Sequence, residues 1–94
     1  MNNTPSNAST THERPRLRPM FRLQWEEVQQ SWVMLFPEGM IRLNPSAAEI
    51  MRRCDGDRTV DQIVGELEQT FNMTALAPEV QAFLAHAREK GWLT

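Results

Sequence analysis

Few side chains in this sequence are suited to chemistry, and they do not fall at the spacings that chemistry requires. The only histidines, His12 and His86, are too far apart to share a helical turn as metal ligands do. The single cysteine, Cys54, falls among apolar residues spaced like one face of a helix, which predicts a buried, unreactive thiol. Glu26 and Glu27 are adjacent carboxylates, but neighbouring strand residues point to opposite faces and cannot form an acid–base pair. The sequence also has no C-x-x-C, glycine-rich phosphate loop or G-x-S-x-G motif, so we expect a protein that is not an enzyme and uses no metal or cofactor.

Length and composition indicate one small domain. The 94 residues carry a formal net charge of −2, and 40% of them are hydrophobic, as in ordinary globular proteins. No apolar run approaches the roughly 18 residues that span a membrane, no secretory signal pattern occurs near Met1, and one cysteine suits a reducing compartment. We therefore expect a cytoplasmic protein. Residues 1–13, rich in Asn, Ser and Thr, are predicted to form a disordered polar tail, and residues 14–94 the folded domain.

A basic segment joins this tail to the domain. It holds four arginines, with two prolines among them that favour extended backbone: Arg14, Arg16, Arg18 and Arg22. One interpretation is a solvated arm. The other is an arm that docks on an acidic surface of a partner protein.

Period-two patterns predict three strands. Residues 21–26 alternate apolar and polar side chains, and residues 31–36 are apolar on both faces, as in a central strand. Pro37-Glu38-Gly39 is a turn signal, and residues 40–43 return as a short third strand. Short connections favour an antiparallel sheet in the order 1-2-3, with the third strand at an edge.

After Asn44 the hydrophobic period changes to that of helices. A first helix is predicted from Pro45, with an S-x-x-E capping box at residues 46–49 and an end at Asp55-Gly56. A second begins after Thr59 with a T-x-x-Q box and has an apolar stripe at Val60, Ile63, Val64, Leu67 and Phe71. A third runs from near Pro78 to Gly91, after which Trp92-Leu93 folds back onto the core. The expected fold is α+β, a three-stranded antiparallel β-sheet followed by three α-helices, similar in shape to a winged helix-turn-helix.

Two kinds of binding fit that fold. DNA binding needs a helix rich in Lys and Arg, but the predicted second helix has none and the third offsets Arg88 and Lys90 with Glu79 and Glu89. A small winged-helix transcription regulator is therefore the weaker hypothesis. Peptide binding needs an uncovered strand edge, and residues 40–43 supply one whose only charge is Arg42. The same edge is alternatively too short to pair at all, or pairs with a second copy in a homodimer.

Several stretches of the sequence resemble the PqqD family, the peptide chaperones of pyrroloquinoline quinone (PQQ) biosynthesis. They are RPRLR at 14–18, FRLQWE at 21–26, LFPEGM at 35–40, Leu43-Asn44, SAAEI at 46–50, RCDG at 53–56 and the terminal Gly91-Trp92. The resemblance covers residues 14–94 in the same order. The tail lies outside it, and the loop at residues 72–77 is a second point of departure.

The resemblance implies a function. PqqD-like proteins are recognition elements for ribosomally synthesised and modified peptides (RiPPs), and they present the precursor peptide PqqA to PqqE, a radical S-adenosylmethionine enzyme that cross-links a Glu and a Tyr. In such domains the peptide adds as a strand to the third strand and packs against the third helix. Carried to this sequence, the implied edge is Met40, Ile41, Arg42 and Leu43, and the implied helix positions, in groove or core, are Val80, Phe83, Leu84 and Ala87.

Overall fold

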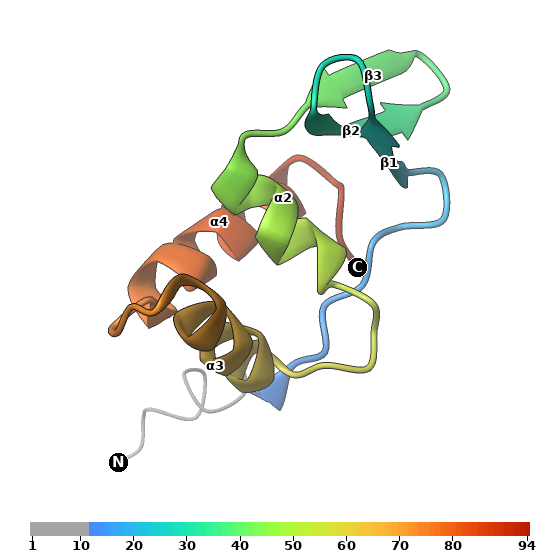
Figure 1. Cartoon of the computed structure of the whole chain (residues 1–94). Coiled ribbons are helices and arrows are strands. Elements are labelled where there is room, and N and C mark those ends of the chain that lie inside the picture. The colour runs from blue at the N-terminus through green and yellow to red at the C-terminus, as the bar shows by residue number, and fades with distance from the viewer. Residues whose placement is uncertain (1–11) are drawn as a thin grey trace.

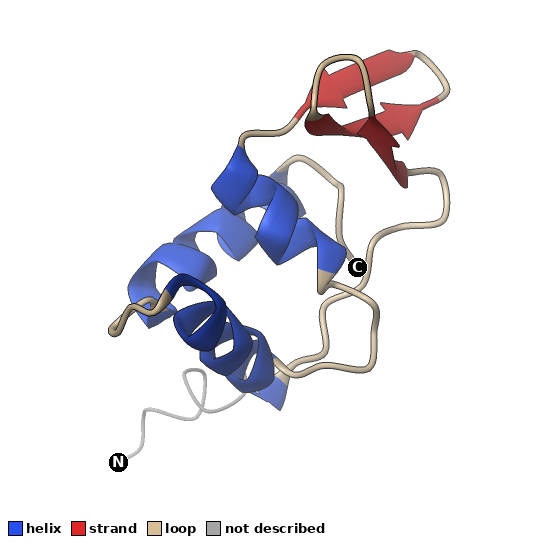
Figure 2. Ribbon diagram, in the orientation of Figure 1, coloured by secondary structure: helices blue, strands red, loops and turns tan. Residues whose placement is uncertain are grey.

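The computed structural model describes residues 12–94 and has a sheet at one end of the molecule and helices at the other (Figures 1 and 2). The elements, labelled as in Figure 1, are β1 (Arg22–Glu26), β2 (Ser31–Phe36), β3 (Gly39–Arg42), α2 (Pro45–Arg52), α3 (Val60–Phe71) and α4 (Ala77–Glu89). The predicted fold class is confirmed, and the strands and the start of α2 lie within one residue of their predicted bounds. The predicted tail, residues 1–13, lies outside the described residues except at its last two positions.

The sheet is the predicted antiparallel meander, with strand order β1-β2-β3. Its register places Leu23, Met34 and Ile41 in one cross-strand row, and all three pack in or against the core. The residue before Met34 in β2, Val33, is opposite Arg42 and faces the other side because side chains alternate along a strand. One sheet face therefore covers the helices, and the other carries the side chains of Met40 and Arg42.

Helix α2 begins with a different cap from the predicted one. The side chain of Asn44 accepts a hydrogen bond from the backbone N–H of Ala47 at 2.8 Å, with Pro45 in the first turn. Ser46 lies one position inside the helix and donates its hydroxyl to Asn44 Oδ1, so the S-x-x-E box does not form. The prediction was wrong because Asn and Ser are comparable N-caps and both precede the same apolar stripe.

The other two helices begin and end largely as their sequences indicate. The predicted capping box of α3 is confirmed, with Thr59 and Gln62 bonded reciprocally. The N-cap of α4, Leu76, has no side-chain cap, but its N–H donates to Glu68 Oε2 at 3.0 Å.

The helices enclose one core beneath the sheet. Its fully buried members include residues from β2 and from all three helices: Met34, Met51, Val60, Ile63 and Leu84. The predicted return of the C-terminus is confirmed, since Leu93 is 3% exposed and Trp92 packs against the core. Phe71 differs from its prediction as a core residue, because 43% of it is exposed at the end of α3.

Residues Glu13–Arg18, here called the N-terminal strap, lie between the C-terminus and the α2–α3 loop (Figure 1). On one side, the N–H of Arg18 donates to Trp92 O and the N–H of Thr94 to Arg16 O, each at 2.9 Å. On the other, Leu17 donates to Cys54 O at 3.2 Å. The backbone of the predicted basic arm is thus bound to the domain. The side chains of Arg14, Arg16 and Arg18 are exposed, although Arg14 and Arg18 each reach a backbone carbonyl at 3.4 Å.

Candidate peptide-binding site

Strand β3 is an edge strand whose outward-facing backbone groups can be assigned. The N–H of Leu43 donates to Trp32 O at 2.9 Å, and these two residues are directly opposite in the register. Bonded and non-bonded pairs alternate along an antiparallel ladder, so Leu43 and Ile41 point their N–H and C=O groups toward β2. The corresponding groups of Met40 and Arg42 therefore point away from the sheet, at its free edge.

An apolar groove opens just beyond the end of β3. It has a volume of about 670 Å³ and lies between the first turn of α2, the end of α3 and the first half of α4. Its lining is mostly apolar: Pro45, Ala47, Ile50, Leu67, Phe71, Met73, Leu76, Val80 and Phe83, with polar groups only at Asn44, Ser46 and Glu79. Asn44 is two residues beyond the end of β3, so the groove begins close to that end of the strand.

The structure divides the predicted helix positions into two groups. Phe83 lines the groove and is half-buried, whereas Val80 touches the lining but is only 2% exposed and also belongs to the core. Leu84 and Ala87 are 1% and 0% exposed, belong to the core and are absent from the lining. A residue with no free surface offers no contact area to a ligand, so these two support the groove from behind.

The predicted edge residues also differ in accessibility. Met40 is 60% exposed, and Arg42 is exposed as well. Ile41 is half-buried against the core, and Leu43 is only 6% exposed. Side chains available on the outer face thus come from Met40 and Arg42, the same residues whose backbone groups point outward.

The sequence analysis missed two residues of the groove mouth, Phe71 and Met73. Phe71 fits the apolar stripe of α3, which is why it was assigned to the core, and Met73 lies in the loop that follows. In the structure they are 43% and 53% exposed on the groove lining. The left-handed Asn72 ends α3 between them, with φ of 53°. The only sequence signal for this exposure would have been the position of Phe71, an apolar-stripe residue in the last turn of a helix that ends at a left-handed residue.

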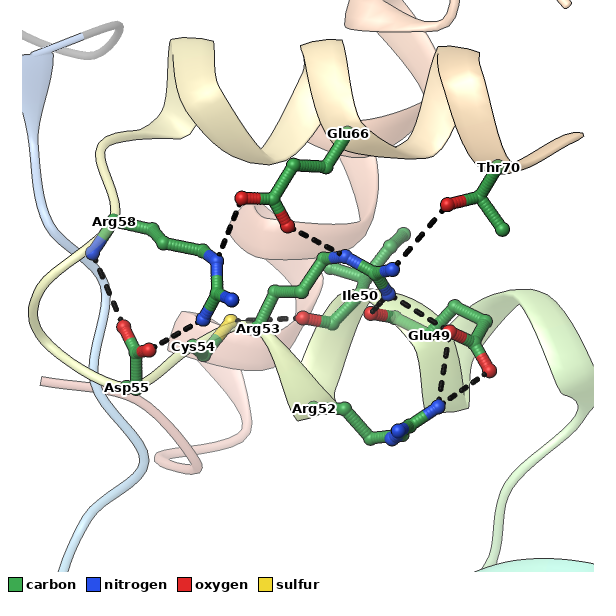
Figure 3. A network of polar contacts seen from close by, with 9 residues as sticks. All are labelled: Glu49, Ile50, Arg52, Arg53, Cys54, Asp55, Arg58, Glu66 and Thr70. Carbon is green, nitrogen blue, oxygen red and sulfur yellow. Dashed lines mark hydrogen bonds and ion pairs between the residues drawn. The ribbon is translucent and has the colours of Figure 1, made fainter. Parts of the chain in front are cut away.

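An ion-pair network fastens α2 to α3, whose ends form two walls of the groove (Figure 3). Glu66 of α3 accepts from Arg53 Nε at 3.0 Å and from Arg58 Nε at 2.8 Å. Arg53 also pairs with Glu49 at 2.8 Å. These donors lower the pKa of Glu66, chiefly through Arg58, and that of Glu49, chiefly through Arg53.

Cys54 lies beside this network but has no chemical role in it. Its thiol donates to the carbonyl of Ile50 at 3.3 Å, and the residue is 4% exposed. Burial raises the pKa of the Cys54 thiol to about 12, so it stays protonated and unreactive at neutral pH. Within residues 12–94, no three His, Cys, Asp or Glu side chains are grouped as a metal site would need. No helix in the part of the chain described is long and apolar enough to cross a membrane.

Comparisons with known proteins point to one family. The model of Coenzyme PQQ synthesis protein D (PqqD) matches residues 31–93. The PqqA binding protein of Methylococcus capsulatus is 44% identical over 77 residues, which cover 82% of this chain and 83% of that protein. The PqqA binding protein of Azotobacter vinelandii is 43% identical over 86 residues, covering 90% and 94% respectively.

A solved structure agrees in fold as well as in sequence. It is the solution NMR structure of the PqqD truncation of Methylobacterium extorquens PqqCD, a functional and stand-alone RiPP recognition element. It matches with a TM-score of 0.67 and 32% identity, over 85% of this chain and 87% of the other. On sequence and fold together, this chain belongs to the PqqD family.

Proposed function

We propose that this protein binds the ribosomal precursor peptide PqqA in the cytoplasm and presents it to the radical S-adenosylmethionine enzyme PqqE. The proposal is supported by the names of its relatives, PqqA binding proteins and a RiPP recognition element. It is a binding role, with the chemistry performed by the enzyme.

The proposed binding mode is strand addition at β3. An extended peptide pairs its backbone with the outward groups of Met40 and Arg42, which provides affinity with little demand on sequence. Side chains on the helix side enter the groove beside Val80 and Phe83 and fix the register. Ile41 and Leu43 hold the strand on β2 and on the core, with Leu84 and Ala87 behind the groove.

The function is then positional. A protein that holds peptide and enzyme together raises the local peptide concentration at the enzyme to the order of mM. The peptide then meets the enzyme more often than it would as a separately diffusing molecule. The observation that carries this proposal is the Leu43–Trp32 hydrogen bond, because it fixes which backbone groups of β3 are free, beside an apolar groove.

The test is a proline at the edge. Arg42→Pro removes an N–H that points outward and is unused in the free sheet, a position where edge strands tolerate proline. We expect its affinity for PqqA to fall at least about tenfold, the cost of a lost hydrogen bond with its partner left unpaired. Arg42→Gln is the reference variant, because it also loses the side-chain charge but keeps the N–H, so the difference between the two variants measures the backbone hydrogen bond.

Isothermal titration calorimetry and amide NMR would measure affinity and site together. Peptide-induced shifts along Met40–Leu43 and Val80–Phe83 are expected, and none with nonspecific duplex DNA. Unchanged affinity in Arg42→Pro, with a folded spectrum, would refute strand addition. A response to DNA alone would refute the peptide function. Sedimentation at rising concentration checks whether a second copy occupies the edge instead of peptide.

The strap is proposed as the contact for the enzyme or for an acidic peptide segment. Its backbone is fastened to the domain, so the exposed arginines are presented on an ordered support. Replacing Arg14, Arg16 and Arg18 together by Ala should weaken binding of PqqE or PqqA, most at low salt. Unchanged affinity for both would contradict this role.

A further inference from the structure

The outer face of β3 presents two side chains of different chemistry. Met40 and Arg42 are separated by one residue, so both project on the side of the sheet away from the core. Ile41 between them points toward the helices, where it packs against the core. The free edge therefore presents an apolar and a cationic side chain on one face.

Arg42 has no ionic partner of its own. Within residues 12–94 its guanidinium forms no ion pair, and its cross-strand neighbour Val33 is apolar. The arginines of the helices and the α2–α3 loop all pair with carboxylates, whereas those of the strap and the sheet do not in the described part of the chain, and among these only Arg42 lies on the β3 edge. A cation left unpaired beside outward-facing backbone groups is suited to meeting an anion on an incoming strand.

An added strand must follow the alternation of the sheet it joins. The peptide residue opposite Arg42 places its side chain on the outer face, next to the guanidinium, because directly opposite residues share a face. The peptide residues on either side of it turn toward the helices. On that side lie Ile41, which packs against the core, and, beyond the end of β3, the apolar groove that begins at Asn44.

We infer that the site selects a peptide segment in which an acidic residue, opposite Arg42, lies between two apolar residues. This inference rests on the strand addition proposed above and adds a sequence rule to it. Opposite charges in a cross-strand pair attract and like charges repel, so Arg42 discriminates by charge while the helix side discriminates by hydrophobicity. Arg42 is thus a specificity-determining residue, in addition to supplying backbone groups.

The probe is a phage-displayed library of random peptides about ten residues long, enough to cover a strand of typical length. It is sorted separately against the wild-type protein, Arg42→Glu and Arg22→Glu, at physiological salt. Arg22 is the matched control, because the structure places it in β1, outside the strap, where it is an exposed arginine on the far edge strand, and its replacement changes the net charge equally. Adjacent strands are about 5 Å apart, so β1 lies two spacings, about 10 Å, from β3. This exceeds the roughly 8 Å beyond which salt largely screens exposed charges, so Arg22 should have little effect at the β3 edge.

The wild-type protein and Arg22→Glu should enrich the same apolar–acidic–apolar pattern. Arg42→Glu should enrich apolar–basic–apolar peptides with the same flanks. In synthetic versions of the enriched peptides, exchanging the central acid for Lys should weaken wild-type binding about three- to tenfold and strengthen Arg42→Glu binding similarly.

If Arg42→Glu and Arg22→Glu changed the enriched peptide pattern equally, the inference would be overturned, since the pattern would then respond to net charge alone. Enrichment without a charged central position would also overturn it, and the strand addition would stand if Arg42→Pro still weakened those peptides. If Arg42→Pro left their affinity unchanged, the proposed binding mode and the sequence rule would fail together.

Discussion

At the scale of single residues, neighbours on α4 face different surroundings. Phe83 is half-buried on the groove lining, whereas Leu84 is 1% exposed within the core. Both belong to the same apolar stripe, because a 3.6-residue period places them on one broad helix face. The period shows that a face is covered, but not whether the protein or its ligand covers it.

Alanine substitutions should separate the two roles. Leu84→Ala removes a side chain without free surface, so we expect the free energy of unfolding to fall by about 2–4 kcal/mol. Phe83→Ala should lower it less, because the ring is partly exposed, but should weaken PqqA binding about tenfold or more. Urea unfolding and calorimetry measure the two effects. A Phe83→Ala protein that binds PqqA as tightly as the wild type would remove Phe83 from the site.

At the scale of elements, local patterns were sufficient to predict most of the fold. Alternation and turn residues identified the three strands, and the Thr59–Gln62 box identified the start of α3. The start of α2 was identified, but its cap was not, since two adjacent polar side chains compete for the same N–H groups. The groove was beyond prediction, because its walls come from the ends of α2, α3 and α4, whose packing follows from no single period.

The contact between α2 and α3 should weaken in acid. Hydrogen-bond donors lower the folded-state pKa of Glu66 and Glu49, and the backbone N–H of Asp57 does the same for Asp55. A carboxyl group with a lowered folded pKa stabilises the fold above its unfolded pKa and loses that effect as pH falls through the folded value. The contribution is therefore complete at pH 7 and is lost progressively below about pH 5.

Glu66→Gln tests this dependence, because Glu66 joins Arg53 to Arg58 across the contact. Its charged groups are well exposed, so the cost at pH 7 should be no more than about 1 kcal/mol. The difference from wild type should be smaller at about pH 3 than at pH 7, because protonation of Glu66 as pH falls through its lowered folded pKa removes the charge that the Gln variant lacks. Urea unfolding at the two pH values gives the comparison. Glu38→Gln, in the β2–β3 turn, is the control, and an equal pH profile for the two variants would contradict the network's role.

At the scale of the whole molecule, the strap near the start of the described residues is joined to the C-terminus. The N-terminal strap lies against the last residues and against the α2–α3 loop, with an isolated bridge between Leu17 and Leu93. Pairings between residues so distant in sequence leave no periodic signal. The prolines of the strap indicated extended backbone, and Trp92-Leu93 indicated a return to the core, but not that each binds the other.

Leu93 should therefore stabilise the strap as well as the C-terminus. It is 3% exposed, and its neighbours Trp92 and Thr94 make two of the strap's backbone hydrogen bonds. Leu93→Ala should lower the free energy of unfolding by about 2–4 kcal/mol, since it leaves a cavity where the two ends meet the core. Thr94→Ala keeps the backbone N–H and changes only an exposed side chain, so its effect should stay within about 0.5 kcal/mol.

Amide hydrogen exchange can show where the loss occurs. If the strap depends on Leu93, the amides of Arg18 and Thr94 should exchange much faster in Leu93→Ala, through local opening of the two ends. The exchange rates of the β2 amides should rise only as far as the loss of global stability requires, because their hydrogen bonds lie within the sheet. Uniform acceleration at every amide would instead mean that the ends and the sheet open as one unit. Exchange rates at the strap would then report global unfolding, and its arginines would be held as firmly as the sheet itself.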